Sequence, residues 1–115
     1  REGIRSKWAE FFGLYDAIIM PISPVPPFPH NHEGNFANRT LLSDGKERPY
    51  LDLVRWTILT GMAYLPSTTP PIGRDADGLP VSFQVVGPYG GDYTTIRLAR
   101  FIAEHNSGYQ RPLLA

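Results

Sequence analysis

The segment DGLPVSFQVVGP (residues 77–88) contains the clearest strand in the sequence. Three apolar residues alternate in it with Ser82 and Gln84, which is the period-two pattern of a strand with one buried face. The dipeptide Asp77-Gly78 before it is a strong turn signal. We therefore expect a strand over Val81–Val86 and place the other elements around it.

A helix is expected on the C-terminal side of this strand. Gly87–Gly91 interrupts the chain, and Asp92 is placed to act as the N-cap of a helix from Tyr93 to about His105. The apolar residues expected to pack this helix on the sheet are Ile96, Leu98, Ala99, Ile102 and Ala103.

On the N-terminal side, Arg74–Pro80 is expected to be a turn and Ser67–Gly73 an extended segment. Before them, Tyr50–Ala63 has helical periodicity, and Pro49 suits the first turn of a helix. Its apolar stripe consists of Leu51, Val54, Ile58 and either Gly61 or Met62.

The first half of the chain begins with an expected amphipathic helix, Arg1–Tyr15. The apolar run Asp16–Ile22 is expected to be a strand buried on both faces. Ser23–Pro49 is expected to be one long loop with a stiff, proline-rich start. Loops of this length usually serve a site or an interface. Together these elements predict an α/β fold with a mixed sheet of about three strands and three helices.

Composition excludes several classes of function. The chain has 115 residues, with 11 basic and 11 acidic side chains that are evenly mixed, so no nucleic-acid partner is expected. It has no cysteine, which excludes disulfides and thiol nucleophiles and suits the cytoplasm. No apolar run approaches the roughly 20 residues of a membrane helix, so no membrane partner is expected.

The candidates for chemistry within the chain are weak. None of the serines lies in a Gly-x-Ser-x-Gly elbow. His30 and His32 could contribute to a metal site, but a solvated polar turn is favoured because no third ligand is fixed nearby. The turn before Asp92 could hold an anion, but a capped strand-to-helix turn is favoured. No cofactor and no metal are expected.

Three segments resemble the C-terminal part of the amidase signature family. They are residues 15–21 (YDAIIMP), residues 60–73 (TGMAYLPSTTPPIG) and residues 77–88, in the order and spacing of that family. The resemblance covers nearly all of the chain. Two departures are Tyr64 and Ser82, which stand where glycine is common in the family.

The resemblance implies an enzyme that hydrolyses carboxamides with a Ser–cis-Ser–Lys triad, and a fragment of the amidase signature fold. The family's serine-rich signature lies upstream of this region, and neither Lys7 nor Lys46 matches the catalytic lysine. Residues 1–115 are therefore expected to be an incomplete C-terminal segment that is inactive alone and has no catalytic residue. The chain also begins at Arg1, without Met, where a helix is already expected.

What the resemblance carries over is pocket shape. It places the end of the first strand and the second helix near a small-molecule amide, which nominates Met20, Ile22, Ser23, Trp56, Thr57 and Thr60 as pocket residues. Ordinary packing remains the alternative for each of them. The alternative for the whole chain is a non-catalytic interaction module derived from an amidase. Because strands taken from a larger sheet leave unpaired edges, the segment is expected to self-associate through a sheet edge or an apolar face.

Overall fold

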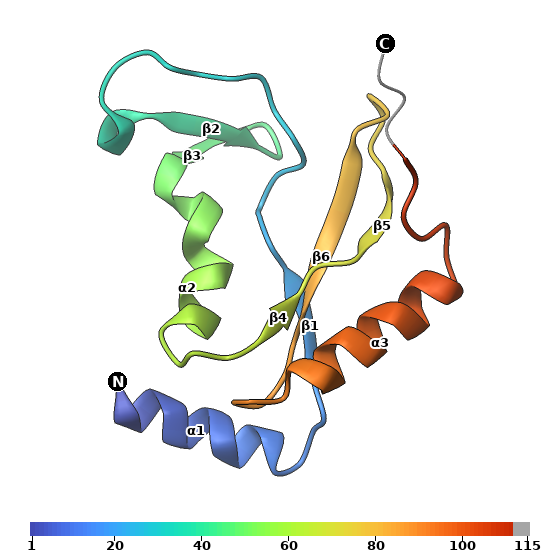
Figure 1. Ribbon diagram of the computed structural model, residues 1–115. Coiled ribbons are helices and arrows are strands. Elements are labelled where there is room, and N and C mark those ends of the chain that lie inside the picture. The colour runs from blue at the N-terminus through green and yellow to red at the C-terminus, as the bar shows by residue number, and fades with distance from the viewer. Residues whose placement is uncertain (112–115) are drawn as a thin grey trace.

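The computed structural model describes residues 1–111 (Figure 1). Three α-helices surround a central sheet, and a separate hairpin lies beside the second helix. The elements are, in chain order, α1 (Glu2–Phe12), β1 (Ile18–Pro21), the 3-10 turn η1 (Phe36–Asn38), β2 (Thr40–Ser43), β3 (Lys46–Pro49), the 3-10 turn η2 (Tyr50–Val54), α2 (Arg55–Gly61), β4 (Ser67–Thr68), β5 (Pro71–Arg74), β6 (Pro80–Val86) and α3 (Asp92–Glu104).

Strand β6 is the centre of the sheet, as its sequence pattern predicts. On one edge it pairs with β1, with Ile18 opposite Val86. On the other edge it pairs with β4 near its end and with β5 near its start. The expected α/β content with three α-helices is confirmed. All pairings of β6 are antiparallel, so the described strands do not form the mixed sheet expected.

The buried side chain of Gln84 links three strands. Its Nε2 donates a hydrogen bond to the carbonyl oxygen of Pro21 in β1, at 2.8 Å. Its Oε1 accepts one from the hydroxyl of Ser67 in β4, at 3.1 Å. A buried amide with both ends satisfied stabilises the strand arrangement and fixes the position of the end of β1.

Strand β1 is an edge strand, and the expectation that it is buried on both faces is wrong. Its residues alternate between half-buried and exposed, and 54% of Ile19 is accessible. Its apolar sequence is typical of a strand with both faces buried, but among residues 1–111 no element covers its outer face.

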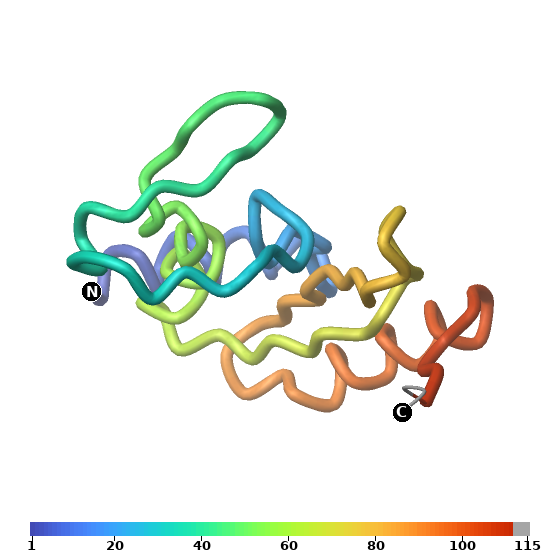
Figure 2. The backbone as a smooth tube through the Cα atoms, turned by 90° about the horizontal axis from the view of Figure 1, so that it is seen from above, coloured from blue at the N-terminus to red at the C-terminus, as the bar shows by residue number. Residues whose placement is uncertain are grey.

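The expected loop over Ser23–Pro49 contains a β-hairpin. Strands β2 and β3 pair with Ser43 opposite Lys46, so that Asp44 and Gly45 form a two-residue turn. Both have positive φ, 53° and 71°, as a type I′ turn requires. The hairpin projects away from the sheet, on the far side from α3 (Figure 2).

Helix α2 ends in a Schellman motif. The backbone N–H of Leu65 donates to Thr60 and that of Tyr64 donates to Gly61. Tyr64 occupies the left-handed position of this motif, with φ 57°, where glycine is the usual residue. Its ring lies 4.7 Å from the guanidinium carbon of Arg1, and its hydroxyl accepts a hydrogen bond from the same group.

Helix α3 packs against β4 and β6. Its N-cap is Gly91, and Asp92 belongs to the first turn, so the expectation that Asp92 caps the helix is wrong. The hydroxyl of buried Thr95 donates to the carbonyl of Asp92 and accepts from Thr68 of β4, at 2.8 Å. Ala99 is buried, but Ile96, which was expected to pack on the sheet, is exposed.

The chain is less compact than a typical folded monomer of the same mass. Its accessible surface is 8611 Å², whereas the scaling for folded monomers gives roughly 6,300 Å² for 12.9 kDa. The radius of gyration is 16.3 Å, against about 13 Å for a compact domain of this length. Within residues 1–111 the buried apolar residues are Leu41, Ala63, Val85, Val86 and Ala99.

The apolar stripe predicted for the second helix is exposed. Leu51, Val54, Ile58 and Met62 each keep between 42% and 51% of their surface accessible. The single helix expected over Tyr50–Ala63 is divided into the 3-10 helix η2 and the α-helix α2, and the described residues leave these four side chains exposed. We call these four residues the α2 stripe.

Candidate functional site

A pocket of about 330 Å³ opens where β1, the hairpin and the second helix meet. Its lining comes from several elements that are far apart in the sequence. The lining residues are Pro21, Ser23, Pro24, Ser43, Arg48, Asp52, Arg55 and Trp56, and we call it the arginine pocket. It brings the expected pocket-forming segments, the end of β1 and α2, to one place.

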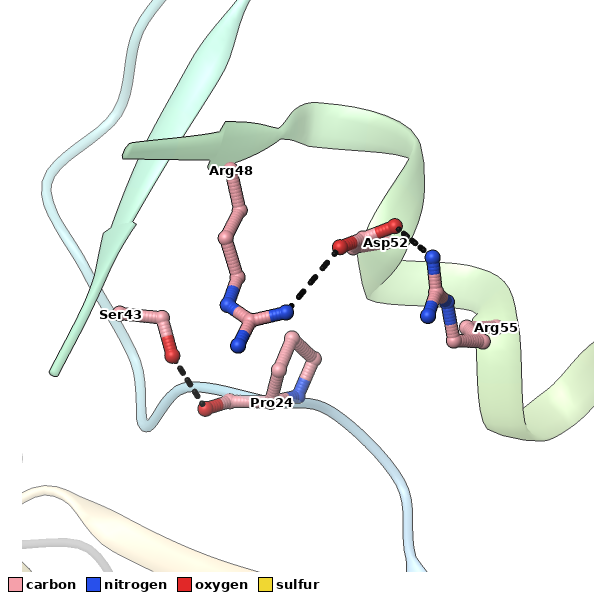
Figure 3. Close-up of polar contacts among 5 residues, drawn as sticks. All are labelled: Pro24, Ser43, Arg48, Asp52 and Arg55. Carbon is pink, nitrogen blue, oxygen red and sulfur yellow. Dashed lines mark hydrogen bonds and ion pairs between the residues drawn. The ribbon is translucent and has the colours of Figure 1, made fainter. Parts of the chain in front are cut away.

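Three charged side chains form the polar part of this pocket (Figure 3). Arg55 donates from Nη2 to Oδ1 of Asp52, at 2.9 Å. Arg48 approaches the other carboxylate oxygen, Oδ2, at 3.7 Å. The Asp52 side chain is only 12% exposed, whereas those of Arg48 and Arg55 are 48% and 65% exposed. The carboxylate is therefore held inside, between two guanidiniums that reach solvent.

Local structure explains why these charges converge. Strand β3 ends at Pro49, where the chain enters the 3-10 turn η2 and then α2 without a break. Asp52 in η2 and Arg55 at the start of α2 are three residues apart, a spacing at which helical side chains meet. Arg48 reaches the same carboxylate from strand β3. The hairpin turn folds β3 back, so that Arg48 extends across the pocket toward Asp52.

Pro21, Pro24 and Trp56 form the apolar part of the pocket wall, and hydrogen bonds hold the segments that carry the two prolines. Gln84 binds the carbonyl of Pro21, which fixes that wall to the central strand. The hydroxyl of Ser43 donates to the carbonyl of Pro24 at 3.4 Å, which connects the hairpin to the proline-rich segment. The half-buried ring of Trp56 completes the lining.

Two of the six nominated residues line the arginine pocket, namely Ser23 and Trp56. Ile22 and Ser23 also line a neighbouring open pocket of about 490 Å³ along the proline run. The hydroxyl of Ser23 accepts a hydrogen bond from the backbone N–H of Val25, at 3.2 Å.

The other three nominated residues lie outside both pockets. The hydroxyls of Thr57 and Thr60 donate to carbonyls three residues earlier, within η2 and α2. Thr60 is buried, which suits packing. Met20 is half-buried in β1, opposite Gln84.

Sequence reasoning missed six residues of the pocket. They are the two prolines Pro21 and Pro24 and the four polar residues Ser43, Arg48, Asp52 and Arg55. Of the four polar residues, Ser43 and Arg48 lie in the segment predicted as loop, and Asp52 and Arg55 lie in the helix predicted after it. The signal that could have found them is Asp44-Gly45, which is a hairpin turn dipeptide. A hairpin at this position would have placed Ser43 and Arg48 beside the following helical turn.

Other chemistry is limited in the part of the chain that the structure describes. Residues 1–111 contain no group of three side chains suited to a metal. The rings of His30 and His32 lie edge to face, with centroids 5.6 Å apart. Lys7 lies on α1 and Lys46 on β3, and neither lines the arginine pocket. None of the described helices has the length and apolar character needed to cross a membrane.

Comparison with known proteins gives consistent matches. The family model Amidase matches residues 1–96. Similar curated proteins include a Glutamyl-tRNA(Gln) amidotransferase subunit of Salinibacter ruber, 34% identical over 88% of this chain and 18% of the relative. The proteins of the same name from Natronomonas pharaonis and Exiguobacterium sp. are 32% and 28% identical, over 84% and 96% of this chain. The chain spans about a fifth of the length of these relatives.

Proposed function

Because this chain belongs to the Amidase family, we propose that it is the C-terminal part of an enzyme that hydrolyses carboxamides to an acid and ammonia or an amine. In this proposal the nucleophile, base and oxyanion hole, a Ser–cis-Ser–Lys set, come from preceding polypeptide. The present segment supplies strands of the sheet and one wall of the substrate pocket. The observation that carries the proposal is the family match over residues 1–96, together with a pocket at the two segments that the family resemblance nominates.

The large accessible surface of the chain supports the proposal that further polypeptide completes the domain. The α2 stripe and an accessible surface well above that of a compact monomer leave apolar area that an additional part of the domain would cover. Burying apolar surface stabilises a fold by roughly 25 cal/mol per Å², so an uncovered stripe of this size favours association with further polypeptide.

The test joins this chain to the amidase region that the proposal places before it. The joined protein is expected to release ammonia from simple amides, whereas the 115-residue chain alone is expected to be inactive. The control is the same joined protein with the signature serine of the preceding region replaced by alanine, which is expected to be inactive. Turnover by the 115-residue chain that is lost when one of its own serines is replaced by alanine would refute the proposal that catalysis lies elsewhere.

A second candidate is an amidotransferase component, in which the released ammonia goes to an acceptor. It is favoured by the names of the relatives, which are amidotransferase subunits. The joined protein distinguishes the two. A hydrolase releases ammonia at full rate alone, whereas an amidotransferase component is expected to accelerate in the presence of its acceptor and partner proteins. The cytoplasmic location expected from the sequence stays a prediction, which fractionation of cells that make the protein would check.

A further inference from the structure

The arginine pocket has an excess of positive charge. Its lining contains two guanidiniums and one carboxylate, while the whole chain has no formal net charge. The charge is therefore local. A cationic group entering the pocket would meet two partly exposed guanidiniums around the buried carboxylate of Asp52, whereas an anionic group would be attracted to both.

The two arginines retain hydrogen-bonding capacity. A guanidinium has five N–H donors in a planar fork that matches a carboxylate. Among the described residues Arg55 donates only to Asp52, and Arg48 lies 3.7 Å from that carboxylate, beyond hydrogen-bond distance. Most donors of both side chains are thus available to a bound oxyanion.

The remaining lining indicates an organic anion. Pro21, Pro24 and the ring of Trp56 supply apolar walls next to the two guanidiniums. The volume of about 330 Å³ is that of a small ligand site and far exceeds the share of a single water molecule. Apolar walls with a cationic end suit a short carbon chain that terminates in a carboxylate.

From this geometry, and resting on the proposed function, we infer that the substrate is an amide carrying a carboxylate away from the bond to be cleaved. Arg48 and Arg55 bind that carboxylate, and Trp56 packs against the carbon chain. Asp52 orients the two guanidiniums and partly neutralises them, which limits how tightly the anion is held. These residues determine specificity and take no part in breaking the bond.

Binding can be tested on the 115-residue chain without catalysis. A Trp8→Phe background leaves Trp56 as the only tryptophan, so that its emission reports on the pocket. The two probes are succinamate and succinamide, which have the same length and differ in a carboxylate against a neutral amide. We expect saturable quenching or enhancement by succinamate, with affinity about tenfold or more above that for succinamide, weakening as salt increases.

Charge variants then locate the binding. Arg48→Gln and Arg55→Gln are each expected to weaken succinamate binding by about three- to tenfold. Asp52→Asn retains the shape and removes the competing charge, so it is expected to tighten binding. Arg97→Gln on α3 makes the same charge change on the far side of the molecule and is expected to have no effect. Far-UV circular dichroism confirms that each variant is folded.

Two outcomes would overturn the inference. Equal affinity for both probes would mean that the pocket does not select a carboxylate. Unchanged affinity in both arginine variants would mean that they only form ion pairs with Asp52.

The joined enzyme separates this inference from the proposed function. Hydrolysis of neutral amides, with no loss of kcat/KM for succinamate in the arginine variants, rejects the carboxylate site and retains the amidase. Binding of succinamate without hydrolysis of any amide retains the site and rejects the amidase.

Discussion

Tyr64 shows how a single residue can depart from a family pattern at a conformational cost. Its left-handed φ of 57° costs a residue with a Cβ about 1–2 kcal/mol. The contact with Arg1 offsets part of this cost, because an exposed cation–π pair contributes about 0.5–1 kcal/mol. We therefore expect Tyr64→Gly to be more stable than Tyr64→Ala by about 1–2 kcal/mol, since only the glycine relieves the strain. Urea unfolding of both variants measures the difference, and equal stabilities would contradict it.

Gln84 provides a pH-dependent test of the link between the sheet and the pocket. Gln84→Glu places a carboxyl at a buried position and, when it is ionised, replaces the donor to Pro21 by an acceptor. Burial raises the pKa of the introduced carboxyl in the folded state above its usual value of about 4.3. The unfolded state then binds fewer protons than the folded state as the pH rises, so the variant loses stability above about pH 4.3 and approaches the parent below it.

Chemical unfolding at pH 4 and pH 7 measures this effect. The gap between Gln84→Glu and the parent protein is expected to widen by at least about 1 kcal/mol from pH 4 to pH 7. Gln84→Met, which is apolar and does not titrate, serves as the control and is expected to show no widening. An equal gap at both pH values would show that the Gln84 side chain is accessible to solvent in solution.

At the scale of elements, the hairpin turn is the feature on which the arginine pocket depends. Gly45 has φ 71°, where a Cβ is strained, so Gly45→Ala is expected to destabilise the β2–β3 hairpin by about 1 kcal/mol. Asp44→Asn is the matched control, because asparagine tolerates the left-handed region and should leave the hairpin intact. Amide hydrogen exchange checks this, with faster exchange expected in β2 and β3 and no change in β6.

Local patterns predict those elements whose side chains alternate or repeat on one face. The strand β6, the three helices and the turn before β6 follow from such patterns. Strand β3 reads Lys-Glu-Arg-Pro and is exposed throughout, so no apolar alternation marks it, and only its turn dipeptide does. The arginine pocket was missed for the same reason, because Ser43 and Arg48 reach it through that hairpin and the turn dipeptide is its only sequence signal. The burial of β1 was overestimated because an apolar composition indicates a covered strand but does not indicate which polypeptide covers it.

At the scale of the whole molecule, the exposed α2 stripe determines what the chain does when it is alone. The stripe leaves four large apolar side chains exposed along η2 and α2, and exposed apolar surface drives association. A second copy of the chain can cover the stripe when no other polypeptide does. We therefore expect the 115-residue chain to self-associate, with a molar mass that rises with concentration in sedimentation or light-scattering measurements.

Lysine variants identify the surface responsible. Ile58→Lys combined with Met62→Lys places two like charges on the α2 stripe and is expected to give a monomer, because association would bury both charges. Ile96→Lys on α3 is the control, since Ile96 is similarly exposed but lies on a different element.

Association that persists in the double variant and is lost in the control would assign the interface to α3. Association lost only on introducing proline at Ile19 would assign it to the free edge of β1, because proline blocks strand addition. A monomer at every concentration would instead mean that the α2 stripe is stable in water, which would remove its support for a covering polypeptide.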